Sequence, residues 1–156
     1  MHIHPGAEPH TEAEKTVVGF LEDWGPGAWP HMRDCYDRWM TDDMSWENTG
    51  SPATEGKQEA MRFLSTLDDT LEMKYCTAEL FNIASRDNVV LTERVVRVHS
   101  ADGTVLMEVP ITGTFVVEDG RIARRGLQRR LPHQGTLSAA PALIRPGFPT
   151  SNGRTT

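Results

Sequence analysis

Apolar residues recur with the period of a helix in the first part of the chain. Thr11 and Glu14 have the spacing of a capping box, in which a hydroxyl and a carboxylate bond the free amides at a helix start. After them, one apolar face recurs at i, i+1, i+4 and i+7, formed by Val17, Val18, Leu21 and Trp24. The pattern predicts a first helix that ends at the Gly25-Pro26-Gly27 sequence.

Two further helices are predicted before the pattern changes. Pro30 suits the first turn of a second helix, whose apolar stripe consists of Met32, Cys35, Tyr36 and Trp39. A third helix is expected after Gly56, with an inward face formed by Met61, Leu64 and Leu67. Between these two helices, residues 44–48 alternate like a short strand that ends at the turn residues 49–52.

From about residue 71 the apolar period changes to two, which is typical of strands. The alternating segments are 71–84, 88–99, 104–118 and 121–128. Asp87-Asn88, Asp102-Gly103 and Asp119-Gly120 separate them, and Asp-Gly between alternating runs favours a hairpin. We therefore predict an α+β fold in which three N-terminal helices pack on a strongly curved, mostly antiparallel sheet.

The chain length and the composition of its ends predict the domain organisation. A chain of 156 residues has the length of one ordinary domain. We expect a flexible N-terminus at 1–10, a pocket domain at 11–131 and a poorly ordered basic tail at 132–156. The tail segment is rich in Pro, Gly, Ser, Thr and Ala, and its apolar residues show no period.

Charge is distributed unevenly along the chain. Residues 121–156 contain seven arginines and no acid, although the whole chain has 22 acidic and 16 basic residues. A basic end can bind nucleic acid, but no aromatic residue is interleaved among the arginines of 121–130 for base stacking. We therefore expect no nucleic-acid partner.

Cysteine, histidine and hydropathy patterns exclude several classes of protein. Cys35 and Cys76 are too few for a disulfide framework, which favours buried thiols in a reducing compartment. No two histidines have the H-x-x-x-H spacing of a helical metal site, so we expect no metal and no other cofactor. No apolar run reaches the about 18 residues of a membrane span, and a signal-peptide pattern is lacking, so we expect a cytoplasmic protein without a membrane partner.

The predicted strand at 88–99 contains the main candidate for a polar site. Alternation places Thr92, Arg94 and Val96 on one face of this strand. A guanidinium on a mostly apolar face needs an acceptor, because an unpaired buried cation is strongly destabilising. We expect that either a structural carboxylate or a ligand supplies this acceptor.

Trp46 and Asn48 form a second candidate pair, since alternate residues of the strand at 44–48 point the same way. An inward amide beside an arginine can hold a water molecule or a polar substrate atom. Trp39 and Met73 are expected in the core or in a pocket wall.

Four stretches of the chain, 41–48, 55–57, 90–95 and 113–122, have a characteristic order and separation. They resemble the limonene-1,2-epoxide hydrolase family over roughly residues 11–125. That family belongs to the superfamily of nuclear-transport-factor-2-like proteins, SnoaL-type polyketide cyclases and ketosteroid isomerases. The resemblance implies a cone-shaped barrel around an apolar pocket, and a homodimer that pairs through the outer sheet face.

The resemblance also implies a one-step acid–base opening of an epoxide. In the family, one aspartate with a tyrosine and an asparagine activates water, a second aspartate protonates the epoxide oxygen, and an arginine bridges the two acids. By position the asparagine is Asn48 and the arginine is Arg94, which makes these two the candidate catalytic residues. Trp46 replaces the tyrosine, and Val96 stands where the second acid is expected. The other acid belongs to the last strand, where residues 125–130 contain none.

Three functional hypotheses follow from this partial match. The first is a relative that binds a small apolar, terpenoid or epoxide-like molecule, with impaired or altered hydrolysis and with Trp46, Thr92, Val96, Trp39 and Met73 lining the site. The second is a non-catalytic binding module in which Arg94 anchors the polar end of its ligand. The third is a SnoaL-like cyclase or ketosteroid-isomerase-like enzyme with an acid elsewhere.

The sequence departs from the family pattern near Arg124, and two interpretations of this departure are open. One is a natural divergent tail, and the other is a change of the gene's reading frame. Sequencing the gene distinguishes them, because the second requires a neighbouring frame that restores a strand ending in an acid.

Overall fold

The structure, a computed structural model, describes residues 1–48, 53–71 and 73–129. Its elements follow in the order β1 (His2–Ile3), α1 (Glu12–Trp24), α2 (His31–Trp39), β2 (Met40–Asn48), β3 (Thr54–Glu55), α3 (Lys57–Leu71), β4 (Tyr75–Arg86), β5 (Val89–His99), β6 (Val105–Glu118) and β7 (Arg121–Arg129). The tail predicted at 132–156 lies outside the described residues.

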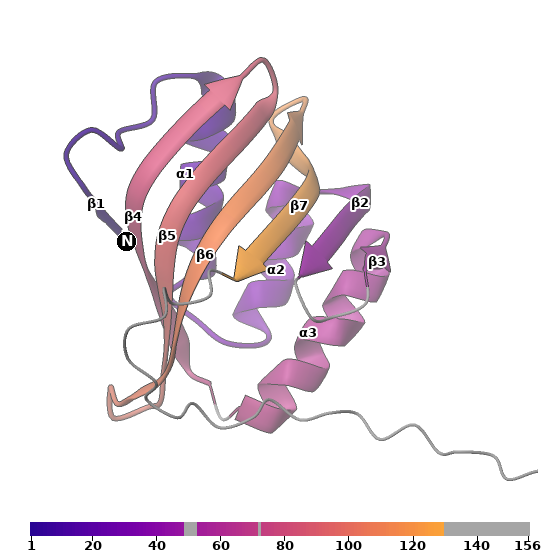
Figure 1. The fold of residues 1–156 in the computed structure, drawn as a ribbon. Coiled ribbons are helices and arrows are strands. Elements are labelled where there is room, and N and C mark those ends of the chain that lie inside the picture. Colours follow the sequence, from indigo (N-terminus) through magenta and orange to yellow (C-terminus); the bar gives the residue numbers. More distant parts are fainter. Residues whose placement is uncertain (49–52, 72, 130–156) are drawn as a thin grey trace, which may run out of the picture.

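The strands form one sheet in the order β1-β4-β5-β6-β7-β2-β3. Strands β4 to β7 make the predicted antiparallel meander, whereas β1 pairs with β4 and β2 pairs with β7 in parallel. Figure 1 shows the three helices on one face of this curved sheet. The α+β prediction is confirmed. The sheet is open, with β1 and β3 at its edges, so closure into a cone-shaped barrel is not observed.

The start of α1 confirms the predicted capping box. The Thr11 hydroxyl accepts from the Glu14 N–H at 3.2 Å, and the Glu14 carboxylate accepts from the Thr11 N–H at 3.1 Å. The helix then buries Val17, Phe20 and Leu21 against the sheet. Within the described part of the chain, no helix is long and apolar enough to cross a membrane.

Two element boundaries differ from the predicted ones. Helix α3 continues to Leu71 and β4 begins only at Tyr75, so the strand predicted from residue 71 is wrong at its start. Leu64, Leu67 and Leu71 keep the helical spacing, and the helix continues with them. Strand β2 begins at Met40 rather than Met44, and both methionines are buried. The earlier start was not predicted, because the polar residues between the two methionines hide the alternation.

The N-terminal residues 1–10, for which we predicted flexibility, make specific contacts in the structure. β1 pairs in parallel with β4, with His2 opposite Glu79 and Ile3 opposite Leu80. The His4 N–H then donates to the Leu80 carbonyl at 2.9 Å. Ala7 is fully buried in a small cluster with Val18 and Leu80. This edge strand was not predicted, because two residues are too few to show a period.

A bulge between β6 and β7 decides which arginines of β7 face the helices. Val117 pairs with Ile122, but Val116 pairs with Arg124, so β7 has one extra residue at this point. As a result Ile122 and Arg125 are both buried, although two residues separate them. Simple alternation from Ile122 would place Arg124 inside, but Arg124 is exposed.

Candidate functional site

Arg94 lies on the helix-facing side of β5 and is almost completely buried, with 1% of its surface exposed. Its Nη1 donates to the Thr92 hydroxyl at 2.5 Å, while Nε and Nη2 have no hydrogen-bond partner within residues 1–48, 53–71 and 73–129. Its guanidinium carbon lies 5.4 Å from the centre of the Phe115 ring. A side chain at Gly113 would collide with Arg94 Nη1, so this glycine leaves the space that the guanidinium fills.

The charge of Arg94 is energetically unfavourable where it lies. Burial, followed by repulsion from the charge of Arg125, lowers the pKa of Arg94 to about 9. One hydroxyl and one ring face replace only part of the hydration that this cation loses. Arg94 is therefore a buried donor that lacks the acceptor predicted for it.

Arg125 on β7 is a second buried arginine, with 4% of its surface exposed. Its Nη1 donates to the Tyr36 hydroxyl, and its Nε has no hydrogen-bond partner in the part of the chain that the structure describes. Four aromatic rings surround its guanidinium carbon, with centres at 5.2 Å (Phe20), 5.3 Å (Trp46), 5.7 Å (Trp24) and 6.0 Å (Tyr36). Such cation–π contacts, at about 0.5–2 kcal/mol each, help to hold a cation in an apolar interior.

Tyr36 and Arg125 are the site residues that the sequence analysis did not single out. Tyr36 comes from α2, where it was assigned to an apolar stripe, although a buried tyrosine hydroxyl usually has a partner. Burial raises the pKa of this phenol, while the charge of Arg125 opposes the shift. The hydroxyl is therefore protonated at neutral pH. Arg125 was grouped with the basic end of the chain, because the β7 bulge cannot be seen in the sequence.

Trp46 lies beside this second arginine, as a wall residue of the same cluster. It is 4% exposed, its ring centre lies 5.4 Å from that of Phe63, and no described residue bonds its Nε1. Asn48 ends β2, where its backbone pairs with Leu127 of β7. The side chain of Asn48 lies outside the part of the chain that the structure describes.

The remaining predicted pocket residues lie in three places. Thr92 and Val96 are buried on the same face of β5 as Arg94, so the structure brings these three together. Met73 is buried in the main core, where its sulfur accepts from the Cys76 thiol at 3.4 Å. Trp39 is held against α1 instead, since its Nε1 donates to Asp23 at 2.7 Å and its ring covers Gly19.

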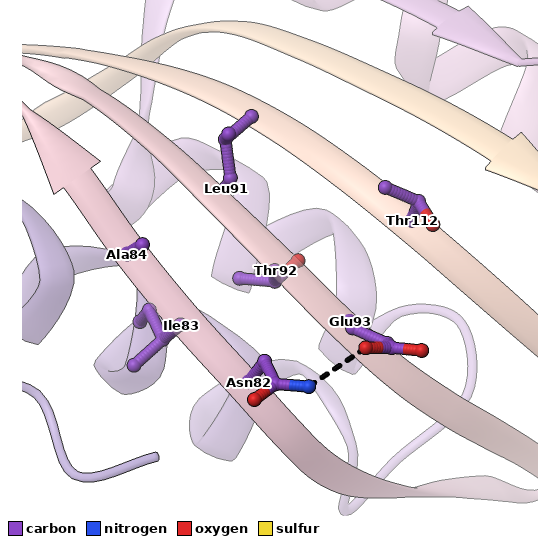
Figure 2. Close-up of a pocket in the computed structure, with 7 residues that line it drawn as sticks. All are labelled: Asn82, Ile83, Ala84, Leu91, Thr92, Glu93 and Thr112. Atoms are coloured by element: carbon purple, nitrogen blue, oxygen red, sulfur yellow. Dashed lines mark hydrogen bonds between the residues drawn. The ribbon is translucent and has the colours of Figure 1, made fainter. Parts of the chain in front are cut away.

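A shallow hollow of about 220 Å³ lies over β4, β5 and β6, as Figure 2 shows. Its lining consists of Asn82, Ile83, Ala84, Leu91, Thr92, Glu93 and Thr112. Asn82 Nδ2 donates to the Glu93 carboxylate at 2.7 Å across it. Neither buried arginine lines this hollow, although Thr92 both lines the hollow and bonds Arg94.

Another cluster of polar side chains lies at the β1–β4 edge. The ligating atoms of His2, His4 and Glu79 lie within 4.8 Å of one another. However, the Glu79 carboxylate already accepts from His4 at 2.8 Å and from Arg97 at 2.9 Å. A cation bonded to the same carboxylate competes with a metal ion, so we interpret this cluster as an ion-pair network.

With this geometry established, comparison with known proteins identifies the family. The model of the limonene-1,2-epoxide hydrolase catalytic domain matches residues 11–126. The chain belongs to this family. None of the curated proteins matches the chain in sequence.

Solved structures share the fold of this limonene-epoxide-hydrolase family member. An epoxide hydrolase from M. tuberculosis described as similar to limonene-1,2-epoxide hydrolase has 24% identity and a TM-score of 0.58, over 76% of this chain and 83% of that one. A protein assigned to the SnoaL-like polyketide cyclases, from Jannaschia sp. CCS1, has 18% identity and a TM-score of 0.61, over 79% and 91%. A nuclear-transport-factor-2-like protein from Burkholderia pseudomallei has 11% identity and a TM-score of 0.60, over 78% and 92%.

The carboxylates that the structure describes do not pair with the buried arginines of this family member. Within residues 1–48, 53–71 and 73–129, no carboxylate pairs with Arg94 or Arg125. Glu47 pairs with the exposed Arg124 at 3.2 Å, and Asp42 pairs with Lys57 at 2.7 Å. Val96, where the resemblance implies an acid, is an apolar core residue.

Proposed function

We propose that this member of the limonene-1,2-epoxide hydrolase family binds a small apolar molecule of terpenoid or epoxide-like character. We further propose that it does not open epoxides by the acid–base route of the family. The observation that supports both parts is the buried guanidinium of Arg94, which has donors to spare and no carboxylate partner among the described residues.

The chemistry of epoxide opening explains why the missing acids matter. Opening the ring in one step needs a base for the water and an acid for the oxygen at the same time. Val96 can be neither, and the Trp46 indole donates hydrogen bonds but cannot accept them. Tyr36 is not available as the base, because burial raises the pKa of its phenol and the hydroxyl therefore keeps its proton at neutral pH. The buried groups of this cluster can therefore position a ligand without activating water.

The proposal gives each site residue a definite role. Arg94 anchors the polar end of the ligand, and Asn48 is the second polar contact. Trp46, Thr92 and Val96 form the nearest wall, and Met73 and Trp39 contribute to the outer wall. In this arrangement affinity depends on the apolar surface of the ligand, and its orientation depends on Arg94.

Two measurements on the purified chain test this function. Equilibrium binding of limonene-1,2-epoxide and of limonene, the parent hydrocarbon without the epoxide oxygen, can be followed by tryptophan fluorescence. Both should show saturable binding. Incubation of the epoxide at saturating protein should give diol no faster than buffer does. Epoxide hydrolysis by the wild-type protein that is lost in Arg94→Met would contradict the proposal that the protein does not open epoxides. Absence of any binding would contradict the whole proposal.

We also propose that the chain forms a homodimer in the cytoplasm. The outer face of the sheet supports the dimer, since Leu91 is 50% exposed at the hollow of Figure 2. Threonine and valine side chains surround Leu91 on the neighbouring strand, at Thr112, Thr114 and Val116. Two free, buried cysteines support a reducing compartment.

A further inference from the structure

Two buried arginines of the domain have no carboxylate partner among its described residues, whereas the buried Lys57 is paired with Asp42. Arg94 and Arg125 come from β5 and β7, and both are more than nine-tenths buried. Three of their nitrogens, Nε and Nη2 of Arg94 and Nε of Arg125, have no hydrogen-bond partner among the described residues. Buried donors are almost always paired in proteins, so this combination indicates that a partner binds there.

The two side chains extend toward the same region. The guanidinium of Arg94 lies over the Phe115 ring, and Phe115 pairs directly with Arg125 across β6 and β7. Their charges act on one another, since the charge of Arg125 is the second cause of the lowered pKa of Arg94. Both charges also oppose the rise in the pKa of Tyr36. An anion placed between the two arginines would relieve this repulsion and pair the free donors.

We propose that Arg94 and Arg125 form an anion subsite that takes the carboxylate of a small apolar carboxylic acid. The three unpaired nitrogens carry four N–H groups, and an ionised carboxylate offers about four lone-pair positions. The surroundings fit an apolar body next to that carboxylate, because Phe20, Trp24, Trp46 and Phe115 line the two guanidinium groups. This inference rests on the proposed small-molecule binding and specifies the chemical class of the ligand.

Binding of matched acids and amides to the full chain tests the subsite. The probes are cyclohexanecarboxylate, benzoate and octanoate, each compared with its uncharged carboxamide at constant ionic strength. Tryptophan fluorescence is a suitable signal, because the rings of Trp24 and Trp46 lie against Arg125. We expect at least one acid to bind tenfold or more tightly than its amide and to raise the melting temperature. Sodium chloride at the same concentration should have neither effect.

Each outcome of this comparison has a definite meaning. Equal affinity of acids and amides overturns the anion subsite but leaves apolar binding intact. A chloride effect as large as that of the acids shows a site for small inorganic ions and also overturns the inference. If no acid binds, the subsite is wrong, whereas the proposed function fails only if amides, limonene and its epoxide also fail to bind.

Variants assign the preference to the two arginines. Arg94→Met and Arg125→Met should each reduce the ratio of acid to amide affinity to about one, while amide affinity is kept. The control is Arg97→Met on β5, because Arg97 is bonded to Glu79 and Glu108 outside the core. Circular dichroism verifies that each variant folds. If a variant fails to fold, the ratio of acid to amide affinity in wild type decides whether the anion subsite exists. A tenfold preference that survives in both arginine variants contradicts the assignment.

Discussion

At the scale of single residues, the interior holds two arginines by different means. Arg125 is surrounded by aromatic rings and bonded to the Tyr36 hydroxyl, whereas Arg94 has one ring and the Thr92 hydroxyl. Arg94 therefore has more unpaired hydrogen-bond donors than Arg125 among the described residues. Adding an acid close to Arg94 should therefore be tolerated better than adding one elsewhere on the same face.

Val96→Asp tests this demand against the matched variant Val98→Asp. Both valines are buried on the Arg94 face of β5, at 6% and 5% exposure, and Val96 is two residues nearer to Arg94. An unpaired buried acid costs several kcal/mol, and an ion pair with Arg94 offsets part of that cost. We expect Val96→Asp to lose about 2 kcal/mol less unfolding free energy than Val98→Asp in urea titrations. Equal losses would show that Arg94 does not lack an acceptor.

The two thiols give a pH prediction. Burial raises the pKa of Cys35 and of Cys76 to about 12. Because these folded pKa values exceed that of an unfolded thiol, the thiols stabilise the fold fully below pH 8.5. This contribution is lost as pH rises from about 9 toward 12, by roughly 3 kcal/mol per thiol at pH 11. The control is the double variant Cys35→Ala/Cys76→Ala, whose unfolding free energy should fall less than that of wild type between pH 8 and pH 11. An equal fall in both proteins would show that the two thiols do not cause the loss of stability.

At the scale of elements, regular strands could be predicted from the sequence and irregular ones could not. The pairing of β5 with β6 is regular from Val89 to Val98, and the register shift next to Arg94 puts its extra residue on β4, so alternation placed Arg94 on the buried face correctly. On β7 one extra residue changes the face, and Arg125 was missed for that reason. The parallel pairing of β2 with β7, which brings Trp46 next to Arg125, is a long-range contact that no local pattern encodes.

Gly113 on β6 provides a test of how closely the strands surround Arg94. A Cβ at Gly113 would collide with Arg94 Nη1 and lie 2.8 Å from the Thr92 hydroxyl. Gly113→Ala should lower the unfolding free energy by roughly 1–3 kcal/mol through overpacking. Gly126→Ala on the neighbouring β7 is the control, because its Cβ would be 3.9 Å from the nearest atoms. Equal stability of the two variants would contradict the observed position of Arg94.

At the scale of the whole molecule, the helices cover one sheet face and leave the other open (Figure 1). The covered face contains the core and both buried arginines, while the open face contains ion pairs at one side and the Leu91 hollow at the other. The proposed ligand site and the proposed dimer contact therefore lie on opposite faces of one sheet. A change on the outer face should alter assembly without altering ligand binding.

Leu91→Glu tests the proposed dimer surface. Leu91 lies near the start of β5 and is 50% exposed. Leu106→Glu is the control, since Leu106 is 46% exposed near the β5–β6 turn at the other end of the hairpin. We expect wild type and Leu106→Glu to sediment as dimers and Leu91→Glu as a monomer with unchanged circular dichroism. Sedimentation of wild type as a monomer would rule out the dimer.

The central claim is that Arg94 and Arg125 are buried cations with no carboxylate partner among the residues that the structure describes. Nuclear magnetic resonance of the arginine Nε–H groups measures this directly, with assignments from Arg94→Lys and Arg125→Lys. The account predicts two slowly exchanging signals whose positions do not change between pH 4 and pH 8, and which shift when a carboxylic acid probe is added. Signals that titrate with the pKa of a carboxyl group in the absence of a probe, or that exchange rapidly with water, would contradict it.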